Sequence, residues 1–150
     1  EALLERELKP GDHVEVWGRQ VYLPRIPSRA KTSRLDASDP KSRGTMPGYE
    51  ELGRDFAAVE ERKPRFLVVS EGWAFAYRPP PAWDHGRTLQ TARLETFSDE
   101  TTRTFVAKLF ANETVYQPVF FSKGSAHFWG ALDTHLSLNT PLWIFERKER

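Results

Sequence analysis

Apolar residues recur at helical spacing in three stretches of the chain, and each stretch predicts a helix. In the first, leucines at positions 3, 4 and 8 share one face before Pro10 and Gly11 end the pattern. The third begins near Ser98 or Asp99 and ends at Asn112. Its expected inward-facing residues are Phe105, Val106, Leu109 and Phe110.

The strongest helix signal lies between Pro47 and Lys63. Proline suits the first helical turn, and Glu50 and Glu51 follow it. Arg62 and Lys63 stand in the last turn, where the helix dipole favours cations. The apolar stripe of this expected helix consists of Tyr49, Leu52, Phe56 and Val59.

Four other stretches predict strands. In "HVEVWG", Val14 and Val16 alternate with Glu15, and "PLWIFERK" closes the chain as a last strand. The unbroken apolar run from Phe66 to Val69 predicts a strand buried on both faces, which is typical of parallel sheets between helices. The stretch "TVYQPVFF" predicts another strand, which Pro118 should push towards a sheet edge or a bulge.

The remaining chain is expected to form two long loops. Residues 28–46 are rich in Ser, Thr, Asp, Arg and Lys without periodicity, and they predict a flexible basic loop. The stretch "SKGSAHFWGALDTHLSLNT" predicts the second. Helices that alternate with strands indicate a single α/β domain over residues 1–150: a three-layer sandwich with a mostly parallel, Rossmann-like sheet and helices on both faces.

Composition narrows the function classes. A net charge of +1 argues against a dedicated nucleic-acid binder, whose domain normally carries a strong basic excess. The lack of cysteine excludes disulfides, thiolate metal sites and a cysteine nucleophile. No apolar run approaches the ~20 residues that span a bilayer. Because the chain begins with Glu1 and not Met, we expect it to be part of a longer protein.

Candidate ligand-binding residues gather after the expected strands. In open α/β sheets, ligands bind beyond the carboxyl ends of strands, and Ser70 and Glu71 stand there. Burial could raise the pKa of Glu71, although a hydrogen bond to a loop or a pairing with an arginine explains it equally well. Aromatic faces and cations near these ends could bind a sugar or a partner. The candidate binding residues are Trp17, Arg19, Arg25, Glu71, Trp73, Tyr77 and Arg78.

Two further chemistries stay open as alternatives. Two histidines and a carboxylate, His127, Asp133 and His135, could hold a metal or serve a small hydrolase or phosphoesterase, or they could be ordinary loop residues. The segment from Arg19 to Arg43 carries seven Lys or Arg against two Asp, so it could bind nucleic acid or anionic lipid headgroups, or be a solvated loop. Neither a P-loop nor a dinucleotide fingerprint is present, and no cofactor is expected.

Three segments together resemble a known family. "LKPGDHVEVWGRQVYLPR", "RKPRFLVVSEGW" and "HLSLNTPLWIFERK" resemble the C-terminal soluble region of bacterial multi-spanning GT-C glycosyltransferases, which are akin to the dolichyl-phosphate-mannose protein mannosyltransferases. In that family the catalytic carboxylates lie in the membrane portion, so the resemblance assigns no catalytic residue here.

The resemblance implies an extracytoplasmic α/β domain at the periplasmic face of a bacterial inner membrane. Its implied partner is the membrane-embedded portion of the same polypeptide. The implied role is non-catalytic: the domain would position an acceptor, a carbohydrate or a polyprenyl-phosphate sugar at the membrane surface.

Overall fold

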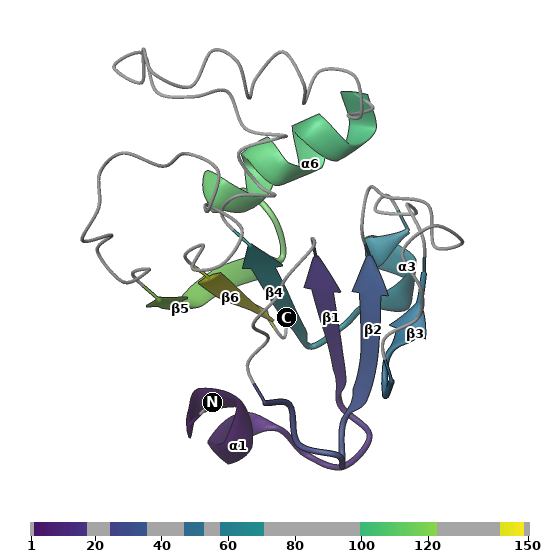
Figure 1. Cartoon of the computed structure of the whole chain (residues 1–150). Coiled ribbons are helices and arrows are strands. Elements are labelled where there is room, and N and C mark those ends of the chain that lie inside the picture. The colour runs from purple at the N-terminus through teal and green to yellow at the C-terminus, as the bar shows by residue number, and fades with distance from the viewer. Residues whose placement is uncertain are drawn as a thin grey trace, which may run out of the picture.

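The described part of the chain folds around one mixed β-sheet (Figure 1). The computed structural model describes residues 2–17, 25–35, 47–52, 58–70, 100–122 and 142–148. The helices in these ranges are α1 (Ala2–Glu7), α3 (Val59–Arg62) and α6 (Glu100–Phe110). The strands are β1 (His13–Trp17), β2 (Lys31–Leu35), β3 (Glu50–Glu51), β4 (Phe66–Ser70), β5 (Tyr116–Ser122) and β6 (Leu142–Arg147).

The strand order is β3-β2-β1-β4-β6-β5. The first four strands in this order run parallel to one another, whereas β6 is antiparallel to both β4 and β5. The chain adds β2 and then β3 on one side of β1, and it then crosses to place β4 on the other side of β1. The direction in which strands are added therefore changes between β1 and β4. The expected α/β class is therefore confirmed, with a sheet that is mixed.

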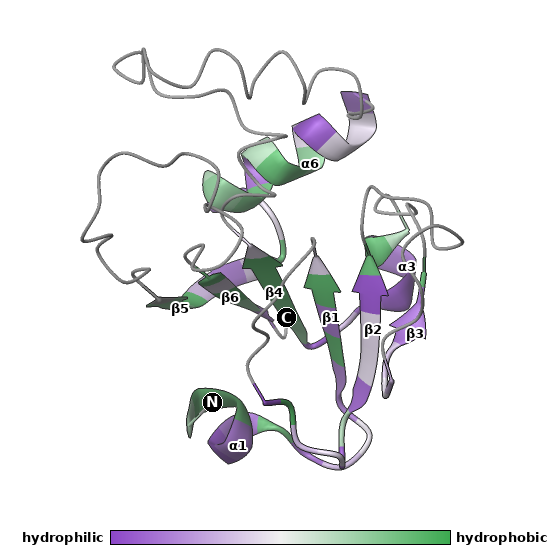
Figure 2. Ribbon diagram, viewed as in Figure 1, coloured by the Kyte–Doolittle hydropathy of each residue, from purple (hydrophilic) through white to green (hydrophobic). Residues whose placement is uncertain are grey.

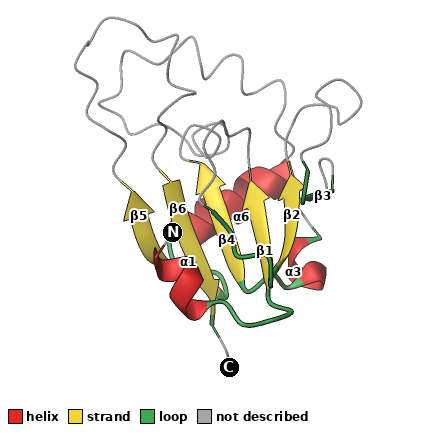
Figure 3. Cartoon of the chain, turned by 60° about the horizontal axis from the view of Figure 1, so that its bottom comes forward, coloured by secondary structure: helices red, strands yellow, loops and turns green. Residues whose placement is uncertain are grey.

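One face of the sheet packs against α1. Leu4 and Leu8 belong to one buried cluster with Val14 and Val16 of β1, and the same cluster takes in residues of β4 and β6. Those residues are Phe66, Val68 and Ile144. Figure 3 shows α1 on one side of the sheet, with α3 and α6 on the other. The leucine pattern predicted from the sequence is the reason that α1 lies on this face.

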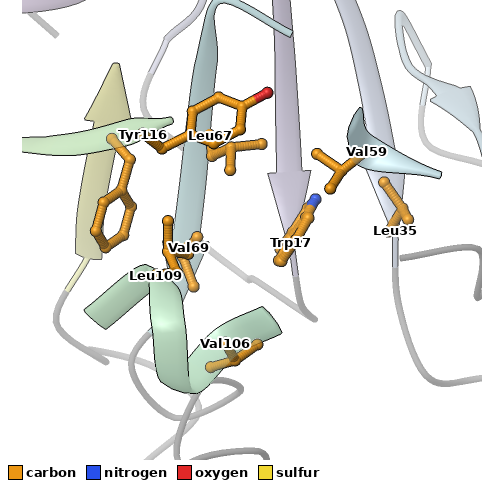
Figure 4. Close-up of a cluster of buried hydrophobic side chains, with 9 residues drawn as sticks. Trp17, Leu35, Val59, Leu67, Val69, Val106, Leu109 and Tyr116 are labelled. Carbon is orange, nitrogen blue, oxygen red and sulfur yellow. The ribbon is translucent and has the colours of Figure 1, made fainter. Parts of the chain in front are cut away.

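The opposite face packs against α3 and α6 (Figure 4). Val106 and Leu109 of α6 and Val59 of α3 are fully buried against this face. The strand residues that share this cluster are Trp17, Leu35, Leu67, Val69, Tyr116 and Phe145. All five residues of β4 are buried, so the predicted strand buried on both faces is confirmed. Figure 2 shows β4 as a nearly continuous run of apolar residues, whereas apolar and polar residues alternate in β1.

A tight turn joins α1 to β1. The N–H of Asp12 donates to the carbonyl of Lys9 at 3.1 Å, and Gly11 has φ of +86°. Proline at the second position and a left-handed glycine at the third match a type II turn. Two arginines bind carbonyls at the end of α1: Arg29 reaches those of Glu5 and Leu8, and Arg65 reaches that of Glu7.

Two sequence predictions on the β2 side of the sheet are wrong. Within the flexible basic loop predicted at residues 28–46, Lys31–Leu35 form β2, in register with β1 (Val14 beside Thr32), and residues 36–46 lie outside the described residues. The helix expected from Pro47 begins instead as a turn followed by β3, and the described helix there is only Val59–Arg62. Gly48, with φ of +84°, does not fit a helix, and Glu50 and Glu51 pair with Lys31 and Arg34.

The other elements follow the predictions. The third helix is α6, and Asn112, with φ of +61°, ends it. Pro118 lies in β5, which is the edge strand of the described sheet, and the β5–β6 register shifts between Pro118 and Phe120. Both consequences predicted for this proline, an edge position and a bulge, are confirmed.

Candidate functional site

Most of the predicted binding residues lie outside the described residues. These are Arg19, Glu71, Trp73, Tyr77 and Arg78, together with the alternative metal set His127, Asp133 and His135. Arg25 is described and exposed. Trp17 is fully buried, and its Nε1 donates to Glu15 at 2.6 Å. Its ring therefore packs in the core and offers no open face to a ligand in this structure.

Three of the described cations of the Arg19–Arg43 segment form ion pairs within the fold. Arg29 binds the end of α1 and forms an ion pair with Glu5 at 3.0 Å. Lys31 pairs with Glu50 at 2.9 Å, and Arg34 pairs with Glu51 at 2.9 Å with both side chains nearly buried. These three cations stabilise α1, β2 and β3, which leaves them poorly placed to bind a nucleic-acid backbone.

A buried carboxylate lies under α3. Glu15 is fully buried, and both of its oxygens accept from the Arg62 guanidinium, at 2.8 and 2.9 Å. Oε1 also accepts from Trp17. The sequence showed only that Glu15 alternates with Val14 and Val16, and it did not indicate that Glu15 is buried. No local signal in the sequence identifies its partner, because Arg62 is 47 residues away.

A histidine–serine pair lies beside this ion pair. His13 Nε2 and Ser33 Oγ are 2.6 Å apart. Burial lowers the pKa of His13, and the charges of Glu15, Lys31, Glu50 and Arg62 act on it in opposite directions. Ser33 is fully buried, so its hydroxyl is closed to a substrate. This pair can order β1 against β2, but the burial of Ser33 does not suit nucleophilic attack on a substrate.

The β5 edge presents consecutive apolar side chains to solvent. Val119, Phe120 and Phe121 are each about two-fifths exposed. Phe120 stands beside Ile144 and Phe121 beside Trp143, so their rings lie on opposite faces of the sheet, and the Phe121 and Trp143 rings are 4.4 Å apart. We call Val119, Phe120 and Phe121 the apolar edge.

A basic pocket adjoins the apolar edge, and Val119 belongs to both. The pocket has a volume of about 310 Å³. Cations line it from three places: the end of α1, the start of β4 and the end of β6. Its lining residues are Lys9, Arg65, Gln117, Val119, Glu146, Arg147 and Lys148.

Arg65 is the anchored residue of the basic pocket. Its guanidinium contacts Asp12 at 2.6 Å and Glu146 at 3.2 Å, and it donates to the carbonyl of Glu7 at 2.8 Å. Burial opposes the charge of Arg65, but the bonds to the two carboxylates outweigh burial and raise its pKa. The pKa of Asp12 is lowered: burial alone would raise it, but the hydrogen bond from the Lys9 N–H and the charge of Arg65 outweigh burial.

The described residues include no cluster of three or more His, Asp or Glu side chains that could hold a metal ion. Within the same ranges, no helix has the length and apolarity needed to cross a bilayer. The sequence did not reveal the basic pocket, because its cations are separated by up to 139 positions and meet only when β6 pairs with β4 beside α1.

Comparison of the chain with protein-family models, with curated proteins and with solved structures gives no match.

Proposed function

We propose that this chain is a non-catalytic, extracytoplasmic accessory domain of a bacterial membrane glycosyltransferase that uses lipid-linked sugars. In this role it docks at the periplasmic face of the inner membrane, beside the membrane-embedded portion of the same polypeptide. There it positions an acceptor, a carbohydrate or a polyprenyl-phosphate sugar. The single observation that carries the proposal is the apolar edge beside the basic pocket.

The chemistry of this surface suits an interface between water and lipid. Val119, Phe120 and Phe121 offer apolar area that gains free energy when it leaves water. The cations of the basic pocket lie beside them, and cations close to an anionic leaflet contribute about 1 kcal/mol each. Aromatic residues combined with cations are typical of proteins that lie on a membrane.

The resemblance to the GT-C soluble region gains support from the positions of its three segments. They contain β1, β4 and β6, which are neighbours in the sheet. These strands supply much of the core on both faces, so the resembling segments coincide with the centre of one folded unit. The position of α1 opposite α3 and α6 further supports our proposal that the whole domain is a three-layer, mostly parallel, Rossmann-like sandwich.

Vesicle flotation tests the docking role. The chain is mixed with vesicles of anionic phospholipid, with and without a polyprenyl-phosphate sugar, and the floated fraction is measured. We expect Phe120→Ser to weaken association about tenfold, because burying a phenylalanine is worth about 1.5–3 kcal/mol. The matched variant Phe120→Leu keeps an apolar side chain and should retain most of the binding.

Two results would contradict the proposal. The first is that the wild-type chain does not float with vesicles of any of the compositions tested. The other is turnover of ester or phosphodiester substrates by the chain alone, which would support the hydrolase alternative instead.

A further inference from the structure

We infer that the basic pocket is a binding site for a phosphate-class anion: a phosphomonoester, a phosphodiester or a diphosphate. This inference deepens the proposed function, which uses the same cations at the membrane surface, by assigning the pocket a ligand class of its own; it is argued from the charges of the pocket and not from the apolar edge. The same chemistry could come from a lipid headgroup or from a free phosphate compound.

The charge of the pocket is unbalanced. Four cations line it, Lys9, Arg65, Arg147 and Lys148, against the one carboxylate of Glu146. If Asp12, which pairs with Arg65 from outside the lining, is also counted, four positive charges still face two negative ones. Both carboxylates are bound to Arg65, so the excess charge belongs to the other three cations.

Within the described residues, Arg147 and Lys148 form no ion pair with a carboxylate, and Lys9 acts only on Asp12, whose carboxylate is already bound by Arg65. Two less exposed arginines of the fold are closely paired, in Arg34–Glu51 and Arg62–Glu15. Lys9, Arg147 and Lys148 form no ion pair of that kind within the described residues, and all three residues line the pocket, from the end of α1 and the end of β6. Like charges gathered without a counter-ion destabilise a fold unless an anion joins them.

The pocket has the size and the fixed framework that a small anion needs. A volume of about 310 Å³ lies at the small end of ligand sites. The backbone around it is held by ladder bonds: the Arg147 N–H donates to Arg65 at 2.9 Å and the Lys148 N–H to Val115 at 2.6 Å. Gln117 adds an amide that can donate to a phosphate oxygen.

Calorimetric titration tests the site. Sodium phosphate and sodium diphosphate are titrated into the chain at low salt, with sodium chloride as the reference. A second arm uses vesicles that contain a lipid phosphate, compared with neutral vesicles. The pocket variant is Arg147→Gln with Lys148→Gln, and the matched control is Lys63→Gln with Lys108→Gln, two exposed lysines outside the pocket.

Saturable binding that weakens about tenfold or more in the pocket variant, and not in the control, is the expected result. Binding in the first arm assigns the site to free phosphates, and binding only in the second assigns it to lipid headgroups. The inference is overturned if neither arm shows saturable binding, or if pocket and control variants weaken it equally. Thermal melting confirms that both variants fold.

These outcomes separate the site from the proposed function. Phosphate binding without flotation would leave the pocket in place and refute membrane docking. Flotation that depends on Phe120 but not on Arg147 and Lys148, without saturable phosphate binding, would support membrane docking and refute the phosphate site.

Discussion

His13 links the stability of the fold to pH at the scale of a single residue. Burial lowers its pKa below the ordinary value of 6.5, so the unfolded chain takes up a proton at a higher pH than the folded chain does. The free energy of unfolding should therefore be highest above pH 6.5. It should fall as the pH drops through 6.5 and level off below the folded-state pKa.

The variant His13→Gln should remove this pH dependence, because glutamine can still bond Ser33 but does not titrate. Urea denaturation at pH 7.5 and pH 5.5 measures the effect in both proteins. Glu15, Lys31, Glu50 and Arg62 remain in the variant, so the difference between the two proteins isolates the imidazole. Equal losses of stability in wild type and variant would show that His13 is not the responsible group.

At the scale of the element, one ion pair attaches α3 to the sheet. Removing Arg62 as Arg62→Met would leave the buried Glu15 carboxylate without its counter-charge, which costs about 3–5 kcal/mol of unfolding free energy. Glu15→Gln keeps an acceptor for Trp17, so the double variant should recover part of the loss. A double-mutant cycle by denaturation measures the coupling.

The exposed Arg6–Glu7 pair supplies the control for this cycle. Arg6→Met should change stability by less than about 1 kcal/mol, because solvent screens the pair. A loss for Arg62→Met no larger than that for Arg6→Met would mean that the ion pair does not hold α3 in place.

The elements that the sequence predicted correctly are those whose stability is visible in their own residues. β4 is a continuous apolar run, and α6 carries an apolar face between Glu100 and Asn112. β2 is different, because its buried Ser33 and Arg34 are satisfied by partners 20 and 17 residues away. A polar strand of this kind has no local signature in the sequence. Glu50 and Glu51 would suit the start of a helix, but in the structure they form ion pairs with Lys31 and Arg34 of β2.

The same limit applies to the candidate sites. The sequence placed Pro118 at an edge or a bulge, which is where the apolar edge begins. It did not indicate that Arg65 would be fixed between Asp12 and Glu146, because these residues meet only through the pairing of β4 with β6. The cations of residues 28–46 attracted attention by their local density, yet the fold pairs Arg29, Lys31 and Arg34 internally.

At the scale of the whole molecule, the two edge strands of the sheet formed by the described residues differ in character. The β3 edge is short and charged, with Glu50 and Glu51 both paired to β2. The β5 edge is longer, exposes apolar side chains and borders the basic pocket. Our proposal of membrane docking uses this asymmetry: the β5 edge would face the lipid surface, and the β3 edge would face water.

Hydrogen–deuterium exchange with and without anionic vesicles tests this central claim most directly. If β5 docks at the membrane, vesicles should slow exchange in Tyr116–Ser122 and at the end of β6, while α6 and β3 keep their rates. Unchanged exchange in β5, or protection centred on α6 or β3, would contradict the account.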